Sequence, residues 1–531
     1  MSGAHVRYFF FTLTAVAILL VARGRAQQTI QPRTFLYPYS LPAVDQGLMG
    51  DLTPGPATAA AFARRATAGS AVMLDRTGSA GSTYVAGRVI VKFRDGVSTA
   101  ARSKSLSLVS AAAAVSERPS YANFDLVRID PTDDAEAVAD ALRQRPDVEY
   151  AQAAYRVHPE MVPNDQLYGL QWNLPMLDLE RAWDIQGTAG SSVTVAVLDT
   201  GIAFQNGVVR FNAQAFQDDL GNLHPALGTV DIPFAAATDL FSSSRFVQPH
   251  DFIWDDNLPL DLDSHGTHVS GTIGQLTNNA LGAAGVAFNV RLMPVKVIDS
   301  DWDDIFGAPN QGTDDVVARG IRYAADNGAK VINMSIGRTG PPAPVIEDAI
   351  KYAVGKGTFI VIAAGNDFED GNPTEVLAEI ASRVSGAVSV AAVDRAKNHA
   401  YYSSTGSWIE LAAPGGDFRS FGYDGLVIQQ TVDLRVGACI VTPRACGVTP
   451  SLTAPRFDVF GFFGFQGTSM AAPHVSGLAA MLIQQGITSP AAVEAALERF
   501  ATDLGDTGRD SVFGYGLVEA RDTLRGLGLA R

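Results

Sequence analysis

Apolar runs alternate with amphipathic stretches over the C-terminal two thirds of the chain, from about residue 172 to residue 524. The apolar runs are short and rich in β-branched residues, as in strands that are buried on both faces of a sheet. They cover residues 193–199, 290–297, 330–336 and 387–393 and the segment 358–366, which ends in a glycine and an amide. Helix-like stretches follow at residues 314–327 and 344–356 and from Ser469 onward. This alternation predicts an α/β fold with a mostly parallel sheet flanked by helices.

A shorter pattern precedes this one. Strand-like stretches at residues 87–93, 124–129 and 148–152 alternate with helix-like stretches at residues 100–108 and 133–145. Two strand-helix units within about 75 residues predict a small α+β domain of the ferredoxin-like type. Residues 27–84 are rich in Ala, Thr, Gly, Ser and Pro and show no sustained period, which is typical of a flexible linker.

The first 26 residues have the pattern of a secretory signal peptide. His5 and Arg7 precede a 15-residue apolar run that ends at Ala22, and small residues follow up to Ala26. We expect cleavage after Ala26, and a retained membrane anchor is the alternative. No later stretch is long and apolar enough to span a membrane, so we expect a secreted protein, extracellular or periplasmic, without stable membrane association. The predicted domains are then 1–26 (signal), 27–84 (linker-like), 85–160 and 161–531.

Composition and charge narrow the classes of function. The 531 residues are 47% hydrophobic, which is enough for a sizeable core in more than one domain. Residues 27–160 hold equal numbers of acidic and basic residues, whereas residues 161–531 carry a net charge of −18. Such an acidic domain argues against nucleic acid or an anionic membrane as a partner. We expect a monomer.

The chain has two cysteines, Cys439 and Cys446, in a predicted loop. In an exported protein such a pair favours a disulfide over two free thiols. Closing so short a loop stabilises the folded state by roughly 2 to 3 kcal/mol.

Three segments carry candidate chemistry. Ser469 lies between small residues where a helix-like pattern begins, so it is a candidate nucleophile, although a helix cap is the plainer interpretation. Asp199 ends a predicted buried strand, at the edge where open α/β sheets bind ligands. His265 and His268 lie three apart at the start of a small-residue helix; a metal pair is the alternative, but the glutamate of the zinc-protease pattern is missing.

The order Asp, His, Ser and the flanks of these residues resemble the subtilase family of serine proteases. The resemblance implies that Asp199 orients the imidazole, His265 is the general base and acid, and Ser469 is the nucleophile, with His268 structural. It also implies that Asn366, at the end of the predicted strand segment 358–366, donates to the oxyanion together with the backbone amide of Ser469.

The same resemblance suggests how a peptide binds. One segment matches the strand edge that pairs with extended substrates, and another matches the wall of the primary pocket. These are Ser335, Ile336 and Gly337, and then Ala363, Ala364 and Gly365. The wall residues are small enough to leave room for a large apolar side chain. An acidic stretch at residues 299–304 lies where outer pockets are built, and it is either a site for basic substrate residues or a solvated loop.

Residues 85–160 resemble the inhibitory propeptide of many subtilases, including the exit segment 148–151. Such a domain assists folding and inhibits the enzyme until it is removed; a non-inhibitory spacer is the alternative. We expect maturation between residues 150 and 167.

Calcium is the expected cofactor, since mixed carboxylate and carbonyl oxygens at close spacing suit it. Two groups of residues resemble calcium sites of the family. They are Asp251, Asp256, Leu258 and Leu260, and then Asp165, Leu276, Asn279 and Ala283. No redox or nucleotide cofactor is implied.

The predicted function is therefore a secreted serine endopeptidase that acts on proteins or peptides and is made as a propeptide-inhibited zymogen. Two alternatives use the same scaffold: an inactive peptide-binding module, and a transpeptidase or cyclase.

Overall fold

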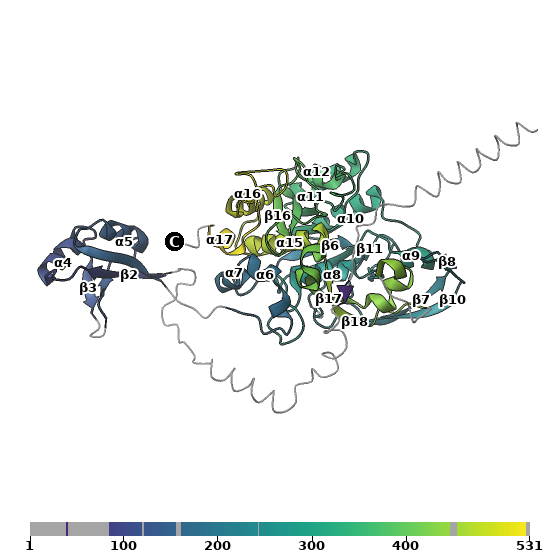
Figure 1. Ribbon diagram of the computed structural model, residues 1–531, viewed down its shortest axis with the longest axis horizontal. Coiled ribbons are helices and arrows are strands. Elements are labelled where there is room, and N and C mark those ends of the chain that lie inside the picture. Colours follow the sequence, from purple (N-terminus) through teal and green to yellow (C-terminus); the bar gives the residue numbers. More distant parts are fainter. Residues whose placement is uncertain are drawn as a thin grey trace, which may run out of the picture. The chain divides into compact units, whose positions relative to one another are not determined.

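The computed structural model describes residues 39–40, 84–118, 122–155, 161–242, 244–446 and 454–526 (Figure 1). The predicted signal peptide, most of the linker-like segment and part of the predicted maturation region lie outside the described residues. The chain divides into two compact units, one built around residues 84–155 and one that contains residues 188–519. No helix in the described ranges is long and apolar enough to cross a membrane.

The smaller unit contains a four-stranded antiparallel sheet in the order β3-β4-β2-β5. Its elements run along the chain as β2 (Tyr84–Phe93), α4 (Thr99–Ser107), β3 (Ala114–Glu117), β4 (Asp125–Arg128), α5 (Ala135–Arg143) and β5 (Val148–Tyr155). Alternate residues of β2, such as Val89 and Val91, are buried in one core with Val138 and Leu142 of α5. This order and connectivity confirm the predicted ferredoxin-like domain.

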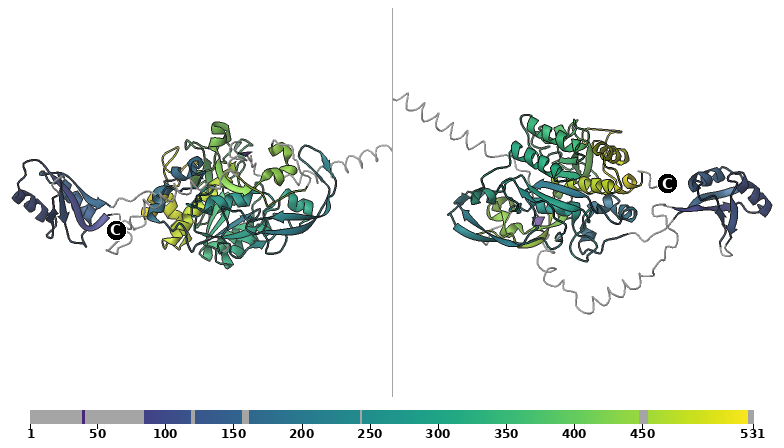
Figure 2. Two further views of the ribbon diagram at one scale, coloured as in Figure 1. Left: turned by 90° about the horizontal axis from the view of Figure 1, so that it is seen from below. Right: turned by 180° about the vertical axis from the view of Figure 1, so that it is seen from behind.

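The larger unit is built on a seven-stranded sheet in which all neighbouring strands are parallel. The strands, in their order across the sheet, are β11 (His250–Asp251), β12 (Arg291–Lys296), β6 (Thr194–Asp199), β13 (Val331–Met334), β14 (Phe359–Ala363), β15 (Ala387–Val393) and β16 (Leu411–Pro414). Helices cover both faces of this sheet (Figures 1 and 2), as the sequence predicted.

The alternation of side chains along β6 decides on which face of the sheet the Asp199 side chain lies. Ala196 and Leu198 of β6 belong to the core cluster formed with α10 (Asp314–Asp326), α11 (Pro344–Gly355) and α12 (Val376–Ala381). Since successive side chains of a strand point to opposite faces, Asp199 points to the other face.

That other face is covered by α8 (His265–Gly274) and α15 (Thr468–Gln484), which pack against each other. The ends of both helices that bear the candidate residues therefore lie on the same side of the sheet as the Asp199 side chain.

Further elements surround the sheet. The segments 203–250 and 418–465 contribute the antiparallel ribbon of β7 (Gly207–Ala213) and β10 (Gly228–Phe234), and the pair β17 (Val427–Val432) and β18 (Phe460–Phe465). The ribbon lies at one end of the larger unit (Figures 1 and 2). The smaller pieces of the larger unit are β1 (Tyr39–Ser40), α6 (Asn173–Met176), β8 (Phe216–Gln217), β9 (Leu223–His224), α9 (Asp301–Phe306), α13 (Phe418–Phe421), α14 (Pro443–Cys446) and α16 (Pro490–Phe500). The short helices α7 (Leu179–Ile185) and α17 (Ala520–Arg525) are grouped with the smaller unit.

The predicted disulfide is confirmed, because Cys439 and Cys446 are bonded. The acidic stretch at 299–304 was predicted to be either a site for basic substrate residues or a solvated loop, and in the structure it forms the start of a short helix. Ser300 and Asp303 form a capping box at the start of α9, and the fully buried Asp303 pairs with Lys296 at 2.8 Å. Asp303 is therefore unavailable to a substrate.

Candidate active site

Asp199 and His265 form a buried pair. Asp199 is the last residue of β6 and His265 the first of α8, and His265 Nδ1 lies 2.6 Å from Asp199 Oδ1. Asp199 is 0% and His265 5% exposed. The carboxylate fixes the imidazole tautomer with the proton on Nδ1. His265 Nε2 is buried and has no hydrogen-bond partner among the described residues, so it is the nitrogen left to accept a proton.

Opposing effects act on the imidazole. Burial on its own lowers the pKa of His265, but the charge of Asp199 and its hydrogen bond, with the charges of Asp263 and Asp261, outweigh burial and raise it. The histidine is thus a stronger base than an isolated imidazole.

Asp261 fixes the turn that leads into α8, a role that the sequence did not reveal. Its Oδ1 accepts the backbone N–H of Ser264 at 2.8 Å, and its Oδ2 accepts the N–H of Thr267 at 2.9 Å. Ser264 has φ 122°, a conformation that a non-glycine residue rarely adopts. The strain sits directly before His265, and the bonds to Asp261 hold it in place.

Ser469 is the second residue of α15, near a helix N-terminus where backbone N–H groups lack helical partners. Pro473 lies four residues later and has no N–H for the Ser469 carbonyl. Ser335 Oγ donates to that carbonyl instead, at 2.8 Å. The Ser469 hydroxyl in turn donates to the Ser335 carbonyl at 3.1 Å, and it makes no hydrogen bond with His265 in this structure.

Asn366 lies beside the start of the same helix. The backbone N–H and the hydroxyl of Thr468 both donate to Asn366 Oδ1, at 2.9 and 3.0 Å. Since the amide oxygen is occupied, the Nδ2 group is left to donate. The arrangement supplies an amide donor and a helix N-terminus next to Ser469, which suits a developing oxyanion.

The two predicted substrate segments leave the sheet at the same edge. Ser335, Ile336 and Gly337 follow β13 directly, while Ala363 ends β14 and precedes Ala364 and Gly365. Strands β13 and β14 pair in parallel, so the two segments emerge side by side.

His268 and His474 are buried structural histidines. His268 Nε2 lies 3.1 Å from the carbonyl oxygens of Val427 and Phe463, so this nitrogen carries the proton. Burial lowers the pKa of His268 to about 3 and that of His474 to about 4. The alternative of a metal pair with His265 finds no support in these contacts, since the two histidines make separate bonds.

One predicted calcium group surrounds a carboxylate that the sequence analysis missed, Asp239. Asn279 Nδ2 and the Ala283 N–H donate to Asp239, at 2.8 and 3.0 Å, and the Leu276 N–H donates to its carbonyl. Asp165 accepts the Asn279 N–H. Burial, and to a lesser degree the charge of Asp165, raise the pKa of Asp239 to about 7, and burial raises that of Asp165. Gln275 Nε2 also donates to Asp239, at 3.0 Å, so N–H groups of the chain already satisfy part of this donor set around two buried carboxyl groups.

The other predicted group fits calcium less well. Asp251 and Asp256 bond to each other through their backbones, and Asp256 accepts the Leu258 N–H at 2.7 Å. The Leu260 carbonyl already accepts from the buried ammonium of Lys296 at 3.0 Å. A cation of the chain itself therefore occupies part of this donor set.

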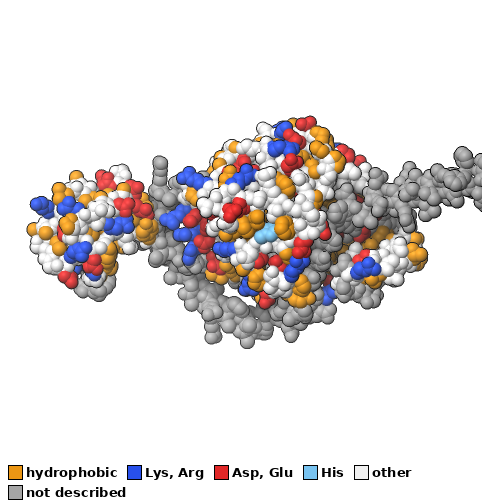
Figure 3. All heavy atoms as spheres, turned by 45° about the horizontal axis from the view of Figure 1, so that its top comes forward, with side chains coloured by type: hydrophobic (Ala, Val, Ile, Leu, Met, Phe, Trp, Pro, Cys, Tyr) orange, Lys and Arg blue, Asp and Glu red, His pale blue; other side chains and the backbone are white. Residues whose placement is uncertain are grey.

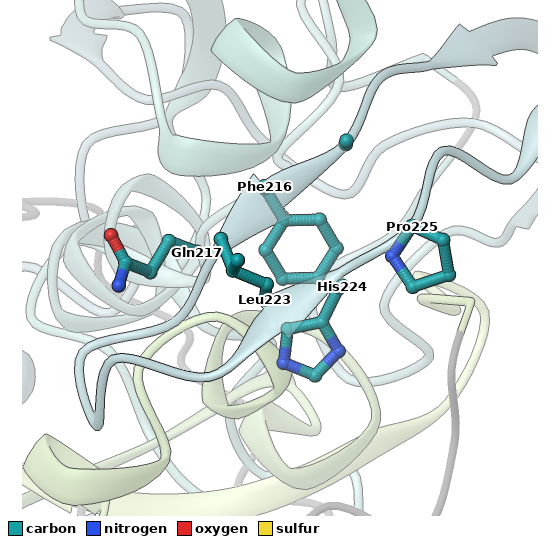
Figure 4. A pocket seen from close by; sticks show the side chains of 6 residues that line it. Phe216, Gln217, Leu223, His224 and Pro225 are labelled. Atoms are coloured by element: carbon teal, nitrogen blue, oxygen red, sulfur yellow. The ribbon is translucent and has the colours of Figure 1, made fainter.

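Two further features lie elsewhere on the larger unit. A pocket of about 470 Å³ is lined by the β8–β9 hairpin, where Phe216 stacks on His224 (Figure 4), and none of its lining residues belongs to the predicted site. Glu410, Glu494 and Glu498 bring carboxylate oxygens within 4.8 Å of one another. Acidic and basic side chains are interspersed over the visible face of the larger unit in Figure 3, without one large basic patch.

Comparisons with known proteins cover both parts of the chain. The family model described as the subtilase family matches residues 190–516, and that of the fervidolysin N-terminal prodomain matches residues 71–153. The thermophilic serine proteinase of Bacillus sp. strain AK1 is 31% identical over 439 residues, which are 82% of this chain and 87% of the relative. The extracellular protease of Xanthomonas campestris is 29% identical over 478 residues, which are 83% of this chain and 74% of the relative. A solved protease structure from Pseudoalteromonas arctica has a TM-score of 0.50 and 30% identity and covers 69% of this chain and 99% of its own.

Proposed function

The chain belongs to the subtilase family of serine proteases, and from this premise we propose that Asp199, His265 and Ser469 are its catalytic residues. The protein is a serine endopeptidase with a fervidolysin-like prodomain. The observation that carries the residue assignment is the 2.6 Å pair of Asp199 and His265, whose second nitrogen is buried and unpartnered.

In the proposed reaction the Ser469 hydroxyl turns from the Ser335 carbonyl toward His265 Nε2. The His265 imidazole accepts the hydroxyl proton of Ser469 as Ser469 Oγ attacks the peptide carbonyl, and Asp199 stabilises the resulting imidazolium. Asn366 Nδ2 and the Ser469 N–H donate to the oxyanion. His265 then gives the proton to the leaving amine, and water hydrolyses the acyl-enzyme by the same steps in reverse.

Substrate is held between the two segments that leave the sheet side by side. We propose that residues 335–337 pair with the extended peptide backbone and that residues 363–365 form one wall of the primary pocket. The parallel pairing of β13 and β14, which puts both segments at one edge beside Ser469, supports this placement.

Export and maturation follow the same proposal. We propose that residues 1–26 direct secretion, that residues 85–160 inhibit residues 161–531 in the precursor, and that cleavage between 150 and 167 activates the enzyme. The prodomain match at 71–153 and relatives named extracellular proteases support this course.

Structural calcium is common among subtilases. Here Asp165, Asp239 and the Asn279 amide would hold it, with carbonyl groups of the 276–283 loop. The ion would neutralise two buried carboxyl groups and so stabilise the loop, without taking part in hydrolysis.

The test compares the full chain with Ser469→Ala and with a matched control, Ser489→Ala. Ser489 is exposed and its side chain makes no capping hydrogen bond. We expect the wild type and the control to release the propeptide, to react with a fluorophosphonate and to cleave peptides, and the Ser469→Ala form to do none of these. Equal maturation and equal peptide cleavage by all three forms would show that Ser469 is not the nucleophile.

A further inference from the structure

Glu375 is a buried acid, and one of its two carboxylate oxygens, Oε2, has no hydrogen-bond partner among the described residues. Glu375 lies directly before α12 and is 4% exposed. A carboxylate in such a position is costly to keep unless something pairs with it.

The side chain lies between the two segments assigned above to substrate binding. A Cβ atom built on Gly337 would stand 2.7 Å from Glu375 Oε2, and one built on Gly365 would stand 2.3 Å from Glu375 Cγ. Both approaches are possible only because these residues are glycines, and Gly365 also has φ +104°. Glu375 therefore packs directly against both segments proposed to hold the substrate, through Gly337 and Gly365.

The surroundings of this carboxylate are short of positive charge. Arg338 is the nearby cation, but its guanidinium forms a two-point pair with Asp314, at 2.6 and 2.7 Å, and donates to the Pro341 carbonyl. Burial first, and then the hydrogen bond and the charge of Asp367, raise the pKa of Glu375 to about 8, while the charge of Arg338 lowers it only in part.

We propose that Glu375 is the specificity-determining residue of the primary pocket and that the enzyme cleaves after lysine or arginine. The proposal rests on the function proposed above and refines it. A basic side chain that reaches Glu375 supplies a cation beside the carboxylate and an N–H donor for its unpartnered Oε2. This proposal replaces the expectation that the primary pocket takes a large apolar side chain. That expectation considered only the small residues 363–365 and not the neighbouring Glu375.

Peptidyl p-nitroanilides that differ only in the residue before the scissile bond test the proposal on the mature enzyme. Arginine is compared with citrulline, which has nearly the same shape without the charge, and with phenylalanine and alanine. Wild type, Glu375→Gln and a control, Glu379→Gln, are assayed. Glu379 lies on the same α12 helix, but its side chain is 45% exposed and pairs with Arg383. Fluorophosphonate labelling of Ser469 counts the active sites in each preparation.

We expect wild type and Glu379→Gln to prefer arginine over citrulline by at least about tenfold in kcat/KM, as a charge-assisted bond implies, and Glu375→Gln to prefer neither. The ratio should also grow as pH rises through about 8, because the ionised Glu375 pairs with the cation. Asp367 and Arg338 are the other charged groups that act on the Glu375 carboxyl group. The protonation of His265 changes the rates on both substrates by the same factor, so it does not affect their ratio.

Three results would overturn the proposal: a wild type that cleaves best after phenylalanine, one that cleaves best after alanine because Glu375 merely fills the pocket, or a Glu375→Gln form that keeps the arginine preference. If Glu375→Gln does not fold, the arginine-to-citrulline ratio of the wild type decides alone. A wild type that neither labels at Ser469 nor cleaves any substrate would instead contradict the function on which this proposal rests.

Discussion

Removing the Ser335 hydroxyl should loosen the helix that carries Ser469. The hydroxyl is buried, donates to the Ser469 carbonyl at 2.8 Å and accepts from Asn333 Nδ2 at 2.9 Å. Because Pro473 cannot supply a helical N–H, Ser335→Ala leaves that carbonyl without a donor and the Asn333 amide without an acceptor.

Each buried polar group that loses its partner costs about 1–3 kcal/mol, so we expect a total of about 2–4 kcal/mol after partial relaxation. If both bonds are already broken in the transition state for unfolding, the unfolding rate rises about 30- to 1000-fold. A shift of the helix start also moves Ser469 from its line of attack, and we expect kcat to fall by about 10- to 100-fold.

Unfolding is measured by stopped-flow fluorescence in guanidinium chloride, in a Ser469→Ala background that prevents autolysis, and kcat is measured in the active enzyme. Ser476→Ala is the matched control, since Ser476 lies on the same α15 helix and donates one bond, at 2.8 Å, to Asn333 Oδ1. It should accelerate unfolding by about the square root of the Ser335→Ala factor. Equal rates for Ser335→Ala and wild type would refute the account of how the Ser469 carbonyl is satisfied.

Asp199→Asn should lower kcat on a peptide substrate by about 10³–10⁴-fold with a smaller change in KM, and an unchanged kcat would contradict its role. Activity requires neutral His265, whose pKa is raised, so kcat/KM should fall as pH decreases with a midpoint above 6.5, and Asp199→Asn should move that midpoint down in a pH-rate profile. Gly266→Ala places a Cβ 2.1 Å from the Gly201 carbonyl, so we expect no mature enzyme on a gel, whereas normal maturation would show that the backbone can yield. A calcium chelator should lower the melting temperature of the wild type and have little effect on that of Asp239→Asn. An equal decrease in the melting temperature of both forms would show that Asp239 does not bind the ion.

The residues at strand ends were predictable because buried parallel strands leave a strong signal. Both faces of such a strand must be apolar, so the runs 193–199 and 358–366 stand out from the sequence, and their ends placed Asp199 and Asn366. The small domain was predictable for a related reason, since β2 alternates buried and open positions.

The sequence pattern did not predict the strands that bury little surface. Strand β3 is an edge strand, and its Val115 is 41% exposed, so no alternation marks it. The ribbon of β7 and β10 shows the same weakness, since Val208 is 66% exposed. Such strands are held by backbone pairing with a partner, and the sequence of one strand carries no information about that partner.

The carboxylates that matter most were hidden for a different reason. In the sequence Glu375 ends an acidic, glycine-containing stretch that is typical of a solvated surface loop, and Asp261 also lies in a polar loop. Each becomes buried because segments distant in the chain close over it. Gly337 and Gly365 lie 38 and 10 residues away from Glu375 in the chain, and their missing side chains admit its carboxylate. Gly337 was predicted as part of the strand edge that pairs with substrate, and Gly365 as part of the pocket wall. In the structure both also make room for the Glu375 side chain, which the small size of these residues alone did not reveal.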